Sequence, residues 1–286
     1  MRKMKQILIC TDLDRTLLPN GRGPESSRAR ESFTRLASRP EVTLVYVSGR
    51  NRELVEDAIQ EYELPLPDWV IGDVGTTLYR VQAEKWQHWP EWEQAISTDW
   101  RGLTANDLRP LFSDMTALRL QEESKQNQYK LSYYLTLPTD TDGLQREMLL
   151  RLNAHKVASS LIYSVDEASS TGLLDVLPAR ATKLHAVEFL MRLQEFDYTN
   201  TVFAGDSGND LLVLASAIPS VLVGNADSDV IEQAQNQALE QGTIAALYLA
   251  QGGFLGMNGN YSAGILEGIA YYHPETRRWM EEDHQQ

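Results

Sequence analysis

The sequence is poor in cysteine, in positive charge and in long apolar runs, and each shortage excludes a class of protein. Cys10 is the single cysteine, so no intrachain disulfide can form. Its place in an apolar run predicts a buried, inert thiol in a reducing compartment. The 26 basic residues are outnumbered by 40 acidic residues, which gives a net charge of −14. A field of this sign repels polyanions, so we expect no binding to nucleic acid or to an anionic membrane.

No apolar stretch approaches the ~20 residues that cross a bilayer. The basic start Met1–Lys5 precedes an apolar run that ends at Asp12, which is too short for the apolar part of a signal peptide. We therefore expect a cytoplasmic protein without membrane segments. Its 286 residues, of which 42% are apolar, suffice for one large or two ordinary domains with a packed core.

Strand-like and helix-like segments alternate over the first 80 or so residues. They are strand-like Gln6–Thr11, helix-like Glu25–Ser38, strand-like Val42–Val47 and helix-like Arg52–Glu61. This order predicts parallel strands joined by right-handed crossovers. The same rhythm resumes at Thr182, with an apolar helix face over Lys183–Leu193, a strand at Thr201–Ala204, a helix from about Asn209 and a strand at Ser220–Val223.

The sequence pattern changes between these two stretches. This part begins with a group of four tryptophans and continues with mixed strand-like and helix-like segments: Lys130–Leu137, Asp142–Asn153, Leu161–Val165 and Gly172–Pro178. Such a mixture predicts a small α+β unit inserted into the first domain. The fold class is therefore predicted to be α/β, with a doubly wound parallel-sheet core at residues 1–82 and 179–286 and an inserted α+β cap domain at 83–178.

Two acidic signatures each follow an apolar strand-like run. The signatures are Asp12–Leu17 and Gly205–Asp210, and their acids are Asp12, Asp14, Asp206 and Asp210. If both strands belong to one parallel sheet, these acids meet at its carboxyl edge, where open α/β sheets bind ligands. Four acids at one point require a cation, and oxygen ligands of this kind suit Mg²⁺. The sequence therefore predicts phosphate chemistry.

Phosphoryl transfer needs a nucleophile, an acid–base group and cations that neutralise the moving phosphoryl oxygens. Asp12 comes first after its strand and is placed to form an aspartyl-phosphate. Asp14 could protonate the leaving alkoxide and later activate water. Ser48 closes the second strand and Lys183 opens a helix, so both could hold phosphate oxygens.

At this point the residues match a family. In chain order, Asp12–Leu17, Ser48–Arg50, Lys183 and Gly205–Asp210 resemble the four motifs of the haloacid dehalogenase-like phosphatases. The position of the insertion resembles that of the members with a large α/β cap. Within this group the chain looks most like sucrose-phosphate phosphatases, on the strings Lys130–Leu135, Asp175–Pro178, Gly205–Asp210 and Ser262–Ala270.

The resemblance implies a role for each matched residue. Asp12 would be the nucleophile and Asp14 the acid–base group, whose backbone carbonyl also binds the metal. The implied Mg²⁺ ligands are Asp12, Asp14, Asp206 and Asp210, and the implied phosphate-binding residues are Ser48, Gly49, Arg50, Lys183 and Asn209. In the cap, Lys130 and Tyr133 are expected to contact the substrate. The family usually has Asn-Lys-Gly where this chain has Thr182-Lys183-Leu184, so we expect a different approach of this backbone to the phosphate.

The leading interpretation is a Mg²⁺-dependent phosphatase that hydrolyses sucrose 6-phosphate, a small-molecule sugar phosphate, through an aspartyl-phosphate. Phosphatases for mannosylfructose phosphate or glucosylglycerate phosphate are alternatives. A phosphosugar mutase shares the motifs and the type of cap. The third reading is a non-catalytic sugar-phosphate sensor or a partner subunit of a sugar-phosphate synthase, and association with such a synthase stays open for the enzyme too. A sensor would have lost Asp12 or Asp14, and both are present.

Other features have plainer interpretations. The faces of Trp86, Trp89 and Trp92 suit sugar rings, but large aromatic side chains more often fill cores. Asp73 lies at a third strand end and is interpreted as a turn carboxylate. The five histidines show no metal-ligand spacing, so we interpret them as structural or solvated.

Overall fold

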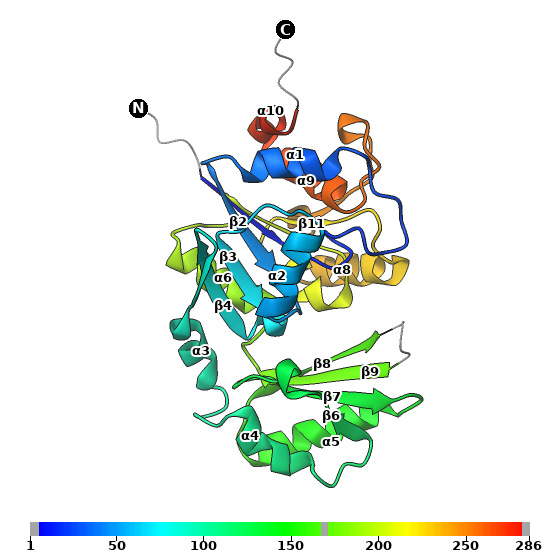
Figure 1. The fold of residues 1–286 in the computed structure, drawn as a ribbon. Helices are drawn as coiled ribbons and strands as arrows, with labels where there is room; N and C mark the ends of the chain where they lie inside the picture. Colours follow the sequence, from blue (N-terminus) through cyan, green and yellow to red (C-terminus); the bar gives the residue numbers. More distant parts are fainter. Residues whose placement is uncertain (1–5, 167–170, 282–286) are drawn as a thin grey trace.

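Two sheets carry the fold of the computed structural model, which describes residues 6–166 and 171–281 (Figure 1). The strands are β1 Ile7–Thr11, β2 Val42–Val47, β3 Trp69–Gly72, β4 Thr77–Gln82, β5 Lys85–His88, β6 Leu118–Leu120, β7 Leu131–Thr136, β8 Ser159–Asp166, β9 Thr171–Pro178, β10 Thr201–Gly205, β11 Ser220–Leu222 and β12 Leu247–Leu249. The helices are α1 Ala29–Ala37, α2 Arg52–Glu61, α3 Pro90–Ser97, α4 Ala105–Leu108, α5 Thr141–Ala154, α6 Lys183–Leu193, α7 Leu211–Leu214, α8 Ser228–Glu240, α9 Ser262–Tyr272 and α10 Arg277–Met280.

The larger sheet has eight strands in the order β12-β11-β10-β1-β2-β3-β4-β5. The strands from β12 to β3 pair in parallel, whereas β4 and β5 add an antiparallel hairpin at one edge. Strand β1 lies next to both β2 and β10, so the order of strands reverses beside β1. Open α/β sheets bind ligands at such a reversal, beyond the carboxyl ends of the strands.

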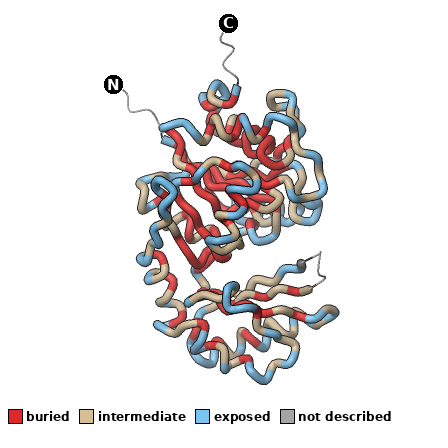
Figure 2. Tube along the Cα trace, viewed as in Figure 1, coloured by how far each residue is buried: buried red, intermediate tan, exposed pale blue. Residues whose placement is uncertain are grey.

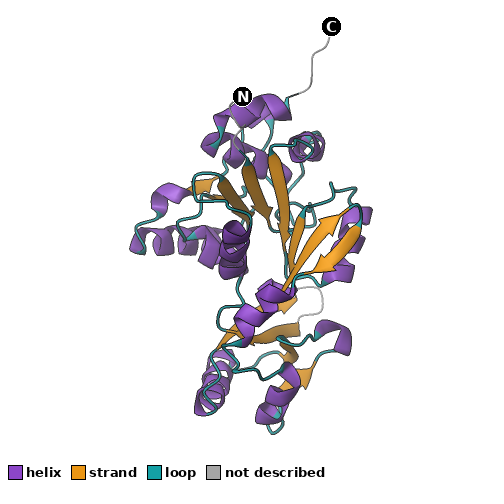
Figure 3. Ribbon diagram, turned by 90° about the vertical axis from the view of Figure 1, so that its left-hand side faces the viewer, coloured by secondary structure: helices purple, strands orange, loops and turns teal. Residues whose placement is uncertain are grey.

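Helices cover both faces of this sheet, which confirms the predicted α/β class (Figure 3). Alternate residues of β1 enter opposite cores, because successive side chains of a strand point to opposite faces. Ile7 and Ile9 pack with α1, α2 and α9, while Leu8 and Cys10 pack with α6, α7 and α8. A strand buried on both sides in this way has little freedom to shift, so the residue that follows it is fixed in space.

The smaller sheet has four antiparallel strands in the order β6-β7-β9-β8. It lies below the core in Figure 1, with α4 and α5 on its far side. Figure 2 marks buried segments in both sheets. All four strands fall within the predicted cap range 83–178, but β5 within that range belongs to the large sheet. The exact division into domains stays a prediction.

Three local expectations need correction. Helix α1 begins at Ala29 and not at Glu25, because residues before it form a turn in which the Ala29 amide donates to Ser26. The helix expected from Asn209 is a single turn, Leu211–Leu214. The strand expected at Leu161–Val165 is longer, Ser159–Asp166. The tryptophans agree with the plainer interpretation, since Trp92 and Trp100 are buried and Trp89 packs edge-on against Trp69.

No helix among the described residues is long and apolar enough to cross a membrane.

Candidate active site

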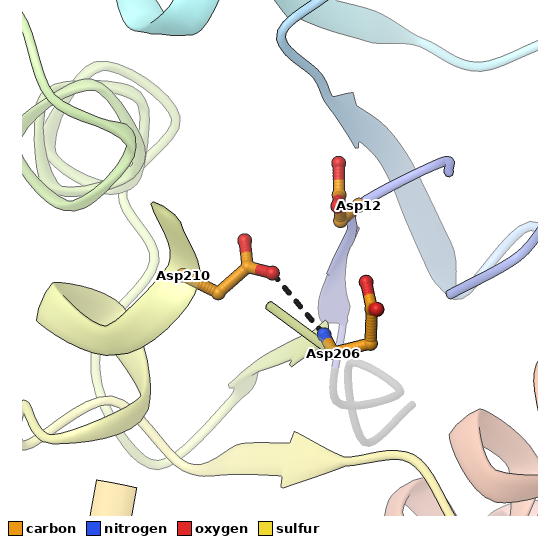
Figure 4. A group of neighbouring side chains, drawn as sticks. All are labelled: Asp12, Asp206 and Asp210. Atoms are coloured by element: carbon orange, nitrogen blue, oxygen red, sulfur yellow. Dashed lines mark hydrogen bonds between the residues drawn. The ribbon is translucent and has the colours of Figure 1, made fainter. Parts of the chain in front are cut away.

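Asp12 and Asp206 lie side by side because they follow two paired strands. Thr11 of β1 is in register with Ala204 of β10, and the Asp12 amide donates to the Ala204 carbonyl at 2.9 Å. Figure 4 shows both carboxylates at the end of their strands, with Asp210 facing them from the next turn. Asp12 is 4% exposed and Asp206 is 1% exposed. The predicted meeting of the two acidic signatures at one sheet edge is thus present in the structure.

Three carboxylates crowd this point. Asp12, Asp206 and Asp210 each offer an oxygen within 4.8 Å of the others. Burial raises the pKa of Asp12 well above its usual range; Lys183 opposes this rise, and the charges of Asp210 and Asp206 add to it. Burial, with the charge of Asp210, also raises the pKa of Asp206 to about 6. Ionised carboxylates at this distance repel one another, so the cluster favours a bound cation.

Asp210 organises the loop around it. One oxygen, Oδ2, accepts from the amides of Asp206 and Ser207, each at 3.1 Å, and from the Ser207 hydroxyl at 3.2 Å. The other oxygen, Oδ1, accepts from Lys183 Nζ at 2.7 Å. Both carboxylate oxygens of Asp210 already have hydrogen-bond partners. These contacts indicate that Asp210 positions Lys183 and the loop at Asp206–Ser207. Its predicted direct ligation of a metal stays a prediction.

Lys183 places a buried positive charge between Asp12 and Asp210. Its side chain is 2% exposed, and Nζ lies 3.0 Å from Asp12 Oδ1. Nζ also donates to Asn209 Oδ1 at 3.0 Å. Burial alone would lower the pKa of Lys183, but Asp12 and Asp210 outweigh it and raise this pKa above its usual value. The lysine is therefore charged and holds the nucleophile candidate, the loop aspartate and Asn209 together.

Leu184 does not disturb this arrangement. Lys183 is the first residue of α6, and the Thr182 side chain caps the helix by accepting from the His185 amide. Leu184 is the second helical residue and packs against the apolar core. A glycine is therefore not needed here for a special backbone angle, and Lys183 still reaches Asp12.

One oxygen of the cluster has the character of a metal ligand. Asp206 Oδ1 accepts from the Thr16 hydroxyl at 2.9 Å, whereas Oδ2 is buried, has no well-aligned hydrogen bond among the described residues and pairs with Arg15 Nε at 3.0 Å. A carboxylate oxygen has more than one lone pair, so Oδ2 can take a cation beside this ion pair. An all-oxygen set at this edge fits a hard divalent cation such as Mg²⁺.

Asp14 lies beside the cluster and is bound to Arg50. The guanidinium donates to both carboxylate oxygens, at 2.9 Å from Nε and 2.6 Å from Nη2. Asn20 donates to the same carboxylate at 2.8 Å. Burial alone would raise the pKa of Asp14, but the hydrogen bonds and charge of Arg50 outweigh it and hold this pKa below its usual value. Asp14 is therefore ionised in this conformation.

The predicted phosphate loop divides into a buried and an open part. Ser48 is fully buried, and its hydroxyl accepts from the Arg50 amide at 3.2 Å. Gly49 and Arg50 line the cavity above the carboxylates, as does Asn209. Ser48 thus shapes the turn in this conformation, while its neighbours are open to a ligand.

A cavity of about 720 Å³ lies between this sheet edge and the cap. The core contributes Asp12, Asp14, Arg15, Gly49, Arg50, Leu54, Val74 and Asp206–Asn209, and the cap contributes Lys125, Leu161–Ser164, Leu173 and Asp175. The motif residues and the cap therefore share one chamber, large enough for a small phosphorylated ligand.

The structure does not bring Tyr133 to this cavity. Tyr133 is 4% exposed and packs edge-on against Phe112 within the cap. Its neighbour Ser132 points to the opposite face of β7, where its hydroxyl bonds to Asp175. This corrects the expected substrate contact, because successive residues of a strand face opposite sides. The run Leu131, Tyr133 and Leu135, all buried, carried the signal that Tyr133 belongs to the apolar side.

Lys130 also lies outside the cavity lining, at the junction of cap and core. Its ammonium is 3.7 Å from Asp73 Oδ1, and both side chains are nearly buried. The interpretation of Asp73 as a turn carboxylate is therefore incomplete. Asp73 is in a turn, with φ of 50°, but it also faces a lysine from the cap. Nearby, the side-chain amide of Asn127 donates to the Thr76 hydroxyl at 2.8 Å. Two cap residues, Lys130 and Asn127, therefore contact this turn.

The turn Asp73–Gly75 connects the motifs to one another as well. The Asp73 amide donates to the Arg50 carbonyl at 2.8 Å, and the Val74 amide donates to the Ser48 carbonyl at 3.2 Å. A Cβ on Gly75, whose φ is 97°, would lie 2.8 Å from the backbone of Thr182. Only glycine permits this approach. The turn was not predicted as part of the site, although its Gly-Asp-Val-Gly string at a strand end was the signal that pointed to it.

Comparison with known proteins agrees with this geometry. A model of the sucrose-6F-phosphate phosphohydrolase family matches residues 5–273. The chain belongs to this family. It is accordingly a phosphoric monoester hydrolase of the haloacid dehalogenase type that acts on sugar phosphates, as the motifs implied.

Individual relatives have differing names. A putative haloacid dehalogenase-like hydrolase of Nitrosococcus oceani is 54% identical over 97% of this chain and 75% of its own length. A mannosylfructose-phosphate phosphatase of Agrobacterium fabrum is 29% identical over 79% of this chain and 86% of its own length. The sucrose-phosphatase of a Synechocystis species, solved with sucrose and phosphate, superposes with a TM-score of 0.72 at 23% identity and covers 94% of this chain and 98% of its own. This last likeness establishes the shared fold.

Proposed function

We propose that the protein hydrolyses sucrose 6-phosphate to sucrose and phosphate, with Mg²⁺ as cofactor and an aspartyl-phosphate at Asp12 as intermediate. The observation that carries the proposal is the buried group of Asp12, Asp206 and Lys183, whose two carboxylates line a cavity between the core and the cap. The family membership supports the sugar-phosphate class of substrate.

Asp12 and Asp206 would hold the metal ion, Asp206 through Oδ2, which has no well-aligned hydrogen bond among the described residues although Arg15 pairs with it at 3.0 Å. The backbone carbonyl of Asp14 is a further predicted ligand. When bound, the ion neutralises the carboxylates and the phosphoryl oxygens. Lys183 adds a positive charge on the other side of Asp12, at 3.0 Å. Gly49, Arg50 and Asn209 surround the space for the phosphoryl oxygens.

In the first step, a carboxylate oxygen of Asp12 attacks phosphorus and the bond from phosphorus to the sugar oxygen breaks. Asp14 gives its proton to the departing sugar oxygen, so that the sugar leaves as a neutral alcohol. Arg50 keeps Asp14 ionised in the present conformation. To act as the acid, Asp14 must therefore take up a proton, lose its hydrogen bonds to Arg50 and contact the sugar oxygen of the substrate.

In the second step, Asp14 accepts a proton from water as the water oxygen attacks phosphorus. The bond from phosphorus to Asp12 breaks, and phosphate and the free Asp12 carboxylate result. Two displacements at the same phosphorus thus replace one harder displacement. A phosphosugar mutase would pass the phosphoryl group to a sugar hydroxyl at this point.

The test is a phosphate-release assay with sucrose 6-phosphate, mannosylfructose phosphate, glucose 6-phosphate and p-nitrophenyl phosphate, each with Mg²⁺. We expect sucrose 6-phosphate to have the highest kcat/KM. EDTA should abolish release, Mg²⁺ should restore it, and Ca²⁺ should bind without restoring it because it tolerates a looser coordination geometry.

The results with the different substrates and metal ions distinguish the proposed function from its alternatives. A preference for mannosylfructose phosphate would replace the substrate and keep the mechanism, and the 29% identity to the phosphatase of Agrobacterium fabrum makes this the second candidate. Isomerisation of a sugar phosphate stimulated by a sugar bisphosphate would favour a mutase. Full activity after exhaustive chelation would contradict the metal. Association with a sugar-phosphate synthase stays a prediction, testable by co-purification.

A further inference from the structure

Arg15 directs a positive charge at Asp206, one of the two carboxylates proposed to hold the metal. Its Nε lies 3.0 Å from Asp206 Oδ2, and its Nη1 lies 3.6 Å from Asp227 Oδ2. The side chain also lines the cavity and is 39% exposed. Arg15 follows Asp14 directly in the chain, but neither the nucleophile nor the acid–base role needs it.

The backbone of Arg15 is held so that the side chain takes this direction. Its φ of 57° is in the left-handed region, which a non-glycine residue enters only when the surroundings enforce it. The Arg15 amide donates to the Asn20 side chain at 2.7 Å, and its carbonyl accepts from Asn225 at 2.6 Å. Asn225 in turn accepts from the Tyr261 amide at 2.8 Å. Three separate segments thus fix the origin of this guanidinium.

The guanidinium changes the charge balance of the cluster. Asp12, Asp206 and Asp210 carry three negative charges when ionised, and Lys183 supplies one positive charge in contact with two of them. Arg15 supplies a second positive charge in contact with Asp206. A divalent cation at Oδ2 would therefore approach an oxygen that already has a neighbouring charge of the same sign, which weakens its binding by Coulomb repulsion.

The contact leaves room for the cation all the same. Arg15 Nε lies 3.0 Å from Oδ2 in an ion pair that lacks the alignment of a hydrogen bond. A carboxylate oxygen has more than one lone pair, so Oδ2 can take a cation beside this contact. The effect expected of Arg15 is therefore that of its charge.

We propose that Arg15 lowers the affinity of the site for its divalent cation, and so sets the cation concentration at which the enzyme becomes loaded. The inference rests on the metal dependence of the proposed function. The second partner of Arg15, Asp227, is exposed, so this guanidinium lies partly in solvent, whereas Lys183 is buried.

The experiment is titration of the metal-free protein with MnCl₂ and with MgCl₂, followed by calorimetry and, for Mn²⁺, by electron paramagnetic resonance. Arg15→Gln should bind both ions about five- to twentyfold more tightly than the unaltered protein, the size of one neighbouring charge under solvent-like screening. Arg15→Lys keeps the charge and should restore an affinity close to that of the unaltered protein. Arg52→Gln is the matched control, because this arginine pairs with Glu56 on α2 and its loss should leave the affinity unchanged.

Arg15→Gly provides a second variant in case the glutamine variant does not fold, since glycine accepts the left-handed φ without strain. It should show the same tightening. Equal or weaker binding in a folded Arg15→Gln or Arg15→Gly protein would overturn the inference, because Arg15 would then be indifferent or would help to organise Asp206. Absence of any cation binding by the unaltered protein would instead remove the metal from the proposed function, and the inference with it.

Discussion

The core and the cap meet at one cavity but line it in different ways. The core contributes ionised groups that are each held by several partners, as Lys183 is by Asp12, Asn209 and Asp210. The cap contributes mainly apolar side chains from β8 and β9, with Asp175 and Lys125 as its charged members. We therefore expect the core to act on any phosphomonoester and the cap to distinguish among the groups attached to the phosphate.

The largest expected effect lies at the nucleophile in the core. Asp12→Asn removes the attacking carboxylate while keeping its size, so turnover should fall by at least about 10³-fold for every substrate. Steady-state kinetics with a sugar phosphate and with p-nitrophenyl phosphate measures this. Asp57→Asn, at an exposed position of α2, is the control and should retain full activity. A folded Asp12→Asn protein with near-normal phosphate release would reassign the nucleophile.

The next effect concerns the buried lysine. Lys183→Met leaves Asp12 and Asp210 without their shared cation, so kcat should fall by about 10²–10³-fold, as when one stabilising donor is lost. Breaking a buried pair of this kind should also lower the free energy of unfolding by about 3–5 kcal/mol. Urea unfolding and kinetics check both. Lys85→Met on the exposed edge strand β5 should change neither, and a stable, active Lys183→Met protein would contradict the assignment.

A smaller and more selective effect is expected in the cap. Asp175 faces the cavity, so Asp175→Asn should reduce kcat/KM for the preferred sugar phosphate by about tenfold, the usual cost of disturbing one polar contact to a substrate. The same variant should change kcat/KM for p-nitrophenyl phosphate by less than about twofold. Tyr133 lies on the opposite face of the cap sheet. Tyr133→Phe should therefore change the ratio of the two kcat/KM values by less than about twofold. Equal losses on both substrates for Asp175→Asn would show that the cap only stabilises the fold.

The smallest effect concerns pH and the junction between the two regions. Burial raises the pKa of Asp73 in the folded protein, although Lys130 and Thr77 oppose the rise. The folded state therefore binds a proton at Asp73 more readily than the unfolded state. As pH falls toward the ordinary pKa of an aspartate, protonation removes the free-energy cost of burying the charged carboxylate. Relative to Asp73→Asn, the unaltered protein should gain stability from pH 7 to pH 4, with a slope below the ~1.4 kcal/mol per pH unit of one full proton. Urea unfolding of both proteins across this range tests the sign, and the opposite slope would mean that Lys130 dominates.

Much of the core follows from local signals in the sequence. Arg52–Glu61 and Lys183–Leu193 were predicted with the bounds that the structure has, because Asn51 and Thr182 cap the two helices at clear sequence positions. The hairpin of β4 and β5 was missed. Its outer strand Lys85–His88 is largely exposed and pairs on one side only, so it lacks the apolar alternation by which strands are recognised.

The site was predictable where parallel-sheet topology decides it. Asp12 and Asp206 had to meet once β1 and β10 were neighbours, since both follow their strands directly. The holding of Arg15 by Asn225 joins loops 210 residues apart and depends on turns that leave no periodic pattern. The side of the cap sheet on which Tyr133 lies could not be read from its string, because the face of a strand changes with every residue and a one-residue error reverses it.

The central place of β1 has a consequence for the order in which the molecule is made. The strand that carries the proposed nucleophile is synthesised before its partner β10, which lies beyond the entire cap, and the Thr16 hydroxyl reaches Asp206 across 190 residues. A nascent chain leaving the ribosome therefore exposes one apolar edge of β1 while the cap emerges and folds. Strand β10 pairs with this edge late, because the two strands can meet only after the long segment between them has been synthesised. The carboxylate cluster thus forms only after β10 has been made, and a chain truncated before Thr201 has Asp12 without the rest of the candidate active site.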